Sequence, residues 1–98
     1  MTPEELIPTK EFCMFHDIEY SFIDSLDNSG LINVKSVQQT TYIDAGEMIK
    51  LEKFIRLHYD LDINIEGIET INYLLEKMEN LQKEIQRLKN SQAGNTEH

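Results

Sequence analysis

Two residues near the amino terminus have the types and the spacing of a metal-binding pair. Cys13 and His16 are separated by two residues, and thiolate and imidazole groups are ligands that zinc prefers. A structural zinc site needs about four such ligands, and Cys13 is the single cysteine, so the chain offers no second pair. The sequence therefore predicts no bound metal, and we expect Cys13 to be a small residue of the hydrophobic core.

Other residues that could do chemistry also lack the partners that they would need. Residues 24–30 have the composition of a calcium-binding loop. However, with Gly30 at the loop's glycine position, Ser25 and Ser36 stand where acidic ligands are required. His58 has no nucleophile or base that the sequence assigns to it, and there is no phosphate-binding glycine loop. We therefore expect a protein that is not an enzyme and uses no cofactor.

The charge of the chain narrows the classes of partner. Nine Lys and Arg residues against 18 Asp and Glu residues give a formal net charge of -9. Residues 1–48 hold nine of these acids and only two of the bases, so the negative charge is concentrated in the first half. Because phosphate contacts need clustered Lys and Arg, this balance opposes nucleic acid and anionic membranes and favours a basic protein partner.

No segment predicts export or insertion into a membrane. Residues 1–5 carry acids where a secretory signal has bases, and no apolar run approaches the ~18 residues of a membrane span. A chain with one cysteine also cannot form an intrachain disulfide, which fits a reducing compartment. The simplest prediction is a cytoplasmic protein.

Local patterns predict the elements that position these residues. After Pro8, a short helix is expected over residues 9–15, and a second over residues 19–27, which the turn at Gly30 ends. Two β-branched or aromatic segments, residues 31–34 and 41–43, predict a small hairpin. Two short helices at a tight corner, followed by a hairpin, are typical of a winged helix-turn-helix.

Two further helices are expected in the second half of the chain. Asp44 and Glu47 have the spacing of a capping box, and Asn64 can cap a long helix whose first turn Ile63 and Ile68 would staple. The helix after Asp44 should bury a broad apolar face, made of Met48, Ile49, Leu51, Phe54, Ile55 and Leu57.

The long helix carries an apolar stripe with the spacing of a coiled coil. Its apolar residues recur at steps of three and four over roughly three heptads, and at ~1.5 Å per residue they extend beyond what a small core could cover. We therefore expect a homodimer. Its orientation stays open, because Glu84 and Lys89 could pair in a parallel dimer. The residues of this seam are Ile71, Leu74, Met78, Leu81, Ile85 and Leu88.

These patterns together predict a mainly α-helical chain with three parts. Residues 1–62 should form a winged helix-turn-helix head with a two-stranded wing, and residues 63–90 a coiled-coil dimerisation helix. Residues 91–98 lack apolar periodicity, so we expect a flexible tail.

The order of these elements, with residues 60–68 leading into the long helix, resembles the MerR superfamily over about residues 6–90. That resemblance implies an antiparallel coiled coil, and a second helix and wing that hold DNA through Arg and Tyr side chains. The chain departs from the pattern, because no Lys or Arg lies between Lys10 and Lys35 and the wing keeps Tyr42 without a neighbouring base. A surface of this kind would repel phosphate.

One branch of that superfamily, the CbpM-type chaperone modulators, is similar in length, in a Glu-Phe-Cys at residues 11–13, in an acidic helix-turn-helix and in a closing coiled coil. This resemblance implies that the partner is the J-domain of a DnaJ- or CbpA-like co-chaperone, whose work with Hsp70 the protein would inhibit. Since J-domains present a basic helix, an acidic surface has an electrostatic reason to bind one. The acids expected to form that surface are Asp17, Glu19, Asp24 and Asp27.

Other interpretations stay open on the sequence alone. The acids could form a solubilising face only, and the first turns of the long helix could pack on their own domain. The chain could also be a dimerisation module for another partner. The rival function is that of a MerR-like DNA-binding transcriptional regulator, whose contacts would come from Lys10, Lys35, Lys50, Lys53 and Arg56.

Overall fold

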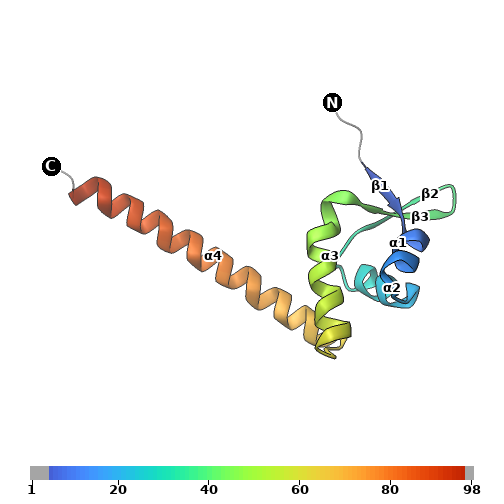
Figure 1. Ribbon diagram of the computed structural model, residues 1–98. Coiled ribbons are helices and arrows are strands. Elements are labelled where there is room, and N and C mark those ends of the chain that lie inside the picture. Colours follow the sequence, from blue (N-terminus) through green and yellow to red (C-terminus); the bar gives the residue numbers. More distant parts are fainter. Residues whose placement is uncertain (1–4, 97–98) are drawn as a thin grey trace. The chain divides into compact units, whose positions relative to one another are not determined.

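A computed structural model describes residues 5–96 of the chain, with side chains through residue 92. The chain divides between Ile68 and Glu69 into two compact units. We call residues 5–68 the head and residues 69–96 the arm, and describe each by itself. The head holds all the strands and short helices of the described chain, and the arm is the continuation of one long helix (Figure 1).

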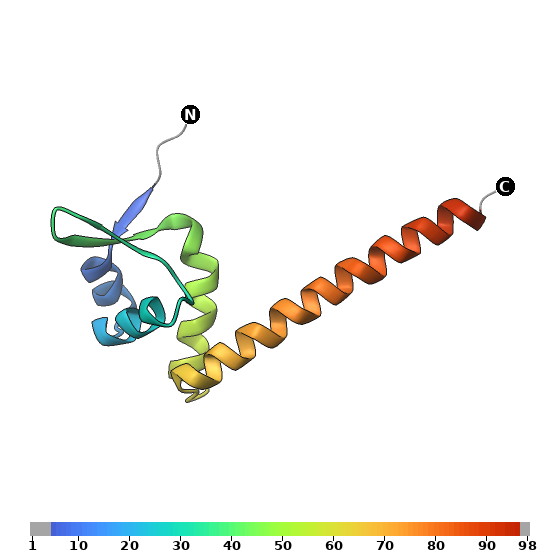
Figure 2. The ribbon, with the colours of Figure 1, turned by 180° about the vertical axis from the view of Figure 1, so that it is seen from behind.

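Three antiparallel strands form the sheet of the head, in the order β1-β3-β2. They are β1 (Leu6–Pro8), β2 (Val34–Val37) and β3 (Thr40–Asp44), and the β2–β3 hairpin turns through two residues with positive φ, Gln38 and Gln39. The predicted two-stranded wing is confirmed as a hairpin, and β1 adds a third strand beside β3 (Figure 2). A three-residue strand is too short to be predicted by alternation.

The first strand of the hairpin begins later than the sequence predicted. Residues 31–34 were expected to form it, but the backbone N–H groups of Leu31 and Ile32 donate to the carbonyl of Leu26, which ends the preceding helix. The turn places the side chains of Leu31 and Ile32 in the hydrophobic core, where both are buried. Gly30, at φ 78°, makes the turn possible, because a left-handed backbone suits glycine.

The two predicted short helices are confirmed as α1 (Thr9–His16) and α2 (Tyr20–Asn28). Asp17 ends α1 in the left-handed conformation, and its backbone N–H is directed to the carbonyls of the last turn. Only two more residues connect the helices, so α1 and α2 form the expected tight corner.

The third helix is built differently from the prediction. A short 3-10 turn (η1, Ala45–Glu47) precedes α3 (Met48–Ile55), and a π-helical turn (η2, Arg56–Asp60) follows it. Asp44 caps η1 by accepting the N–H of Gly46 at 2.9 Å. Glu47 does not complete a capping box, because it accepts the N–H of Asn33 at 2.7 Å. Ile49, expected in the core, is 85% exposed, so that part of the predicted apolar face is wrong.

Every helix and the hairpin contribute to the core of the head. Phe54 and Leu51 of α3 are completely buried, as is Ile68 from the first turns of the long helix. The predicted burial of Cys13 is confirmed. The other buried apolar residues are Phe12 from α1, Phe22, Ile23 and Leu26 from α2, Leu31 and Ile32 from the loop, and Ile43 from β3.

The long helix, α4, spans Ile65–Thr96. The Asn64 carboxamide accepts the N–H of Gly67 at 2.8 Å, so the predicted cap is confirmed, and Ile63 packs against the core that contains Ile68. The helix continues to Thr96, beyond the end of the apolar pattern at Leu88. Of the predicted tail, residues 97–98 lie outside the described residues, and flexibility of residues 91–98 stays a prediction.

Candidate partner-binding surface

Two of the four predicted acids lie in the corner between α1 and α2. Asp17 and Glu19 are both exposed. The backbone N–H of Glu19 donates to the Tyr59 hydroxyl at 3.1 Å, which ties the start of α2 to the end of the α3 region. Tyr59 in turn packs edge-on against Phe22 of α2, with ring centroids 5.4 Å apart. These contacts fix the backbone of the corner and leave both carboxylates in solvent.

The other two acids lie on α2 and have different surroundings. Asp24 is exposed, on the face of α2 opposite the buried Phe22 and Leu26. Asp27 is half-buried, and its Oδ1 accepts the backbone N–H of Val34 at 3.1 Å. Asp27 therefore holds the start of the hairpin against the end of α2. Three of the predicted carboxylates are free to meet a partner, and the fourth has a structural bond.

No basic residue lies on α2, the helix that would read DNA in a winged helix-turn-helix. Its solvent face carries Tyr20, Ser21, Asp24 and Asn28. A phosphate approaching this face would meet carboxylate and hydroxyl groups with no positive charge from the helix itself. The predicted acid Asp24 therefore lies on the exposed face of α2.

Three of the five cations proposed for DNA contact interact with groups of the head itself. Lys35 forms an ion pair with Asp44 at 3.5 Å, and Lys50 forms one with Glu47 at 3.3 Å.

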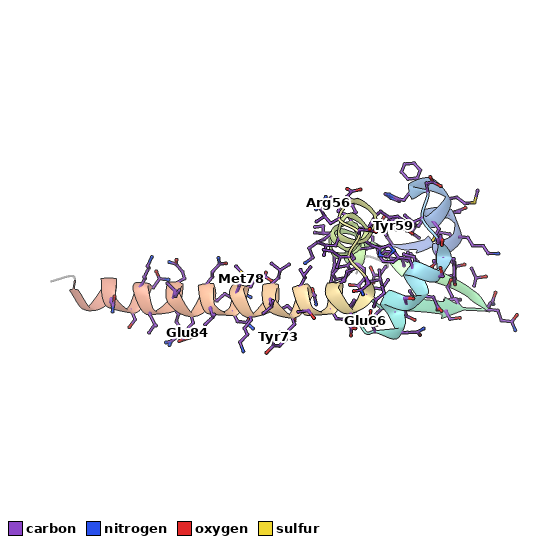
Figure 3. All side chains as sticks on the ribbon, turned by 90° about the horizontal axis from the view of Figure 1, so that it is seen from below. Arg56, Tyr59, Glu66, Tyr73, Met78 and Glu84 are labelled. Atoms are coloured by element: carbon purple, nitrogen blue, oxygen red, sulfur yellow. The ribbon has the colours of Figure 1, made fainter. Side chains whose placement is uncertain are left out.

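The ammonium of Lys53 lies 5.5 Å from the centre of the Phe54 ring. Lys10 and Arg56 are exposed, on α1 and at the start of η2 respectively, and Figure 3 labels Arg56 and Tyr59 of η2. The structure does not gather these five cations on one element.

A cavity of about 320 Å³ lies between the helix-turn-helix and the hairpin. Tyr20 of α2 reaches the hairpin through its hydroxyl, which lies 2.7 Å from Thr41 Oγ1. No local pattern predicts this cavity, because its walls come from four separate elements, β1, α1, α2 and the hairpin. They are Pro8, Lys10, Glu11, Tyr20, Gln39, Thr40 and Thr41.

Cys13, His16 and His58, the residues first considered for metal binding or acid–base chemistry, pack in or against the hydrophobic core. Burial raises the pKa of the Cys13 thiol, which lowers its reactivity at neutral pH. His16 packs on Phe12 with ring centroids 4.2 Å apart, and His58 stacks on Phe22 at 4.5 Å. Among the described residues, no three His, Cys, Asp or Glu side chains are grouped so as to hold a metal ion.

The arm presents most of the predicted seam to solvent. Leu74, Met78, Leu81, Ile85 and Leu88 are between 48% and 58% exposed, and Ile71 is half-buried. Figure 3 shows Met78, a seam residue, on the opposite side of α4 from Tyr73 and Glu84.

Polar contacts lie off that stripe. The Glu84 carboxylate pairs with Arg87, and the Lys77 ammonium lies 3.3 Å from the Tyr73 hydroxyl. These bonds within the helix support its surface and leave the seam itself without polar groups.

No helix in the described part of the chain is long and apolar enough to cross a membrane. Searches of curated proteins and of solved structures gave no match. The model of the MerR HTH family regulatory proteins matches residues 7–90, which covers most of β1, the helix-turn-helix, the hairpin, α3 and most of α4. The chain therefore belongs to the MerR HTH family of regulatory proteins.

Proposed function

We propose that this protein is a homodimeric, CbpM-type chaperone modulator. In this role it binds the J-domain of a DnaJ- or CbpA-like co-chaperone through the exposed acids of its helix-turn-helix, Asp17, Glu19 and Asp24, and so inhibits the work of that co-chaperone with Hsp70. It acts as a binding protein, with no catalytic step and no cofactor.

The solvent face of α2 carries this proposal. That face has Asp24 and no cation, and the exposed carboxylates of Asp17 and Glu19 lie at the adjoining corner. An exposed carboxylate surface attracts a basic helix and repels phosphate, so the same charges favour the one partner and oppose the other. The ion pairs of Lys35 and Lys50 further reduce the positive charge that DNA would need.

The test measures binding of a purified J-domain by fluorescence anisotropy at two salt concentrations. We expect Asp24→Lys to weaken binding about tenfold at about 0.05 M salt, and the difference to shrink at about 0.5 M, where exposed charges are screened. Glu52→Lys is the matched control, because Glu52 is an exposed acid on α3. Equal affinities of these two variants would show that the acidic face of α2 is not the contact surface.

The seam supports the second part of the proposal, the dimer. Five apolar side chains in one stripe, each about half exposed, have no cover within the arm, and burying such a stripe against a second copy removes it from water. Light scattering should give twice the chain mass of 11.5 kDa, and Leu81→Asp should give a monomer. A wild-type monomer at micromolar concentration would refute the dimer.

Crosslinking distinguishes the two orientations of the dimer. In an antiparallel pair that matches all six seam residues, Leu74 meets the partner's Ile85, and Lys77 lies near the partner's Glu84. In a parallel pair, Leu74 meets the partner's Leu74. Leu74→Cys alone should therefore form a disulfide only if the dimer is parallel. A mixture of Leu74→Cys and Ile85→Cys should form the mixed disulfide only if it is antiparallel.

The rival function, transcriptional regulation, is supported by membership of a family of regulatory proteins and by the exposed Lys10 and Arg56. A mobility-shift experiment on the DNA upstream of its own gene is the test. A regulator should bind at physiological salt, lose affinity steeply as salt rises, and weaken further when Lys10 is replaced by Ala. Specific DNA binding with no J-domain binding would replace the first proposal by this one.

A further inference from the structure

Two large apolar side chains stand side by side on the solvent face of α1. Met14 is 81% exposed and Phe15 is 85% exposed, and of the large apolar residues whose side chains the structure describes only Ile49 is as exposed. Single exposed apolar residues are ordinary, but two adjacent ones on an eight-residue helix form a patch. We call Met14 and Phe15 the α1 patch.

The exposure of the α1 patch follows from how α1 packs. The helix buries Thr9, Phe12 and Cys13 on one side, and the helical period places Met14 and Phe15 on the other. The Phe15 ring meets the ring of His16 edge-on, with centroids 5.1 Å apart.

Charged residues surround the α1 patch and are mostly acidic. Glu11 lies one helical turn before Phe15, Asp17 follows two residues after it, and Glu19 immediately precedes the next helix. Lys10, one turn before Met14, is the exception. An apolar centre with an acidic rim has the composition of a protein-binding surface rather than of a solubilising face.

We propose that the α1 patch is the apolar anchor of the partner-binding surface and that its occupant is a basic amphipathic helix. The occupant buries one or two large apolar side chains against Met14 and Phe15 and places Lys or Arg beside Glu11 and Asp17. The acidic rim selects a basic helix by charge. This inference rests on the proposed function, in which the partner is a J-domain, and it makes Phe15, beside the carboxylates, a residue on which affinity depends.

The experiment compares three alanine variants, each at a highly exposed apolar residue, for binding of the same J-domain by titration calorimetry. Phe15→Ala should weaken binding about tenfold or more, as removal of a buried aromatic anchor does, and Met14→Ala should weaken it less. Ile49→Ala is the matched control, since Ile49 is also 85% exposed but lies on α3, and it should bind as the wild type does.

The salt dependence of binding and the heat-capacity change on binding distinguish the contribution of the apolar anchor from that of the charged residues. The loss in Phe15→Ala should persist at about 1 M salt, whereas the loss in Asp24→Lys should largely disappear. The heat-capacity change on binding should also become less negative in Phe15→Ala, because less apolar surface is buried. Thermal melting of each variant should match the wild type, because these side chains are exposed.

Each outcome decides between the two proposals. If the wild type binds the J-domain and Phe15→Ala and Met14→Ala bind as Ile49→Ala does, the anchor is refuted and the proposed function stands. If the wild type does not bind the J-domain, both are refuted. If Phe15→Ala lowers the mass of the protein in the absence of any J-domain, a second copy covers the α1 patch and the inference is overturned.

Discussion

Replacement of Asp27 tests whether the four acids have one role or two. The hydrogen bond from the Val34 N–H to Asp27 Oδ1 is partly buried, and a bond to a charged acceptor contributes about 1.5–3 kcal/mol. Two effects reduce the loss in Asp27→Ala. Water can reach the freed N–H, and a negative charge in the last turn of α2 opposes the helix dipole by about 0.3–1 kcal/mol. We therefore expect a net loss of about 1 kcal/mol in the free energy of unfolding.

Thermal melting measures this difference directly. A loss of about 1 kcal/mol lowers the Tm of a domain of this size by roughly 4–8 °C. Asp24→Ala should leave the Tm within about 2 °C of the wild type, because Asp24 is exposed and no bond ties it to the hairpin. Asp27→Asn should melt above Asp27→Ala, because the carboxamide oxygen still accepts the N–H of Val34. If Asp27→Ala melts as Asp24→Ala does, the structural role of Asp27 is wrong.

Three further predictions concern the head. Replacing Gln38–Gln39 by Asn-Gly should stabilise it by about 1 kcal/mol in urea unfolding, because both residues have positive φ in a two-residue hairpin turn that Asn-Gly prefers; an unchanged midpoint would contradict this. Phe54→Ala should cost about 3–5 kcal/mol, since Phe54 is completely buried, and circular dichroism should show a head that is unfolded or melts far below the wild type. The hydrogen bond that the Asp44 carboxylate accepts from the Gly46 N–H, together with the nearby Lys35 ammonium, lowers the pKa of Asp44. The ionised carboxylate therefore stabilises the head at neutral pH, and this stabilisation is lost as the pH falls below about 4. The difference in Tm between the wild type and Asp44→Asn should shrink over that range.

Much of the fold follows from short-range patterns. Pro8, Asn64 and the Asn28–Gly30 turn fix where helices begin and end, because capping and turn chemistry depend on a few adjacent residues. The features that the sequence did not predict are those that join distant segments. Strand β1 forms only because β3 lies beside it, and Glu47 leaves its own helix to bind Asn33.

The candidate site likewise has features that the sequence predicts and features that depend on contacts between distant segments. The excess of acid in the first half of the chain, and the absence of Lys and Arg between Lys10 and Lys35, could be read directly as charges. Which of the acids is available could not, because Asp24 and Asp27 differ only in what lies opposite them: solvent for one and the backbone of Val34 for the other.

The sequence by itself determined the family-typical order of elements, the acidic character of the helix-turn-helix and the apolar seam of α4, since each depends on residue type and on spacing along one helix. Only the tertiary structure decided which side chains are exposed on the assembled head. Met14 and Phe15 lie in solvent while Phe12 and Cys13, their immediate neighbours in the chain, are buried. The physical reason is that burial depends on the sum of all the elements packed around a residue, and those elements come from parts of the chain that no local pattern connects.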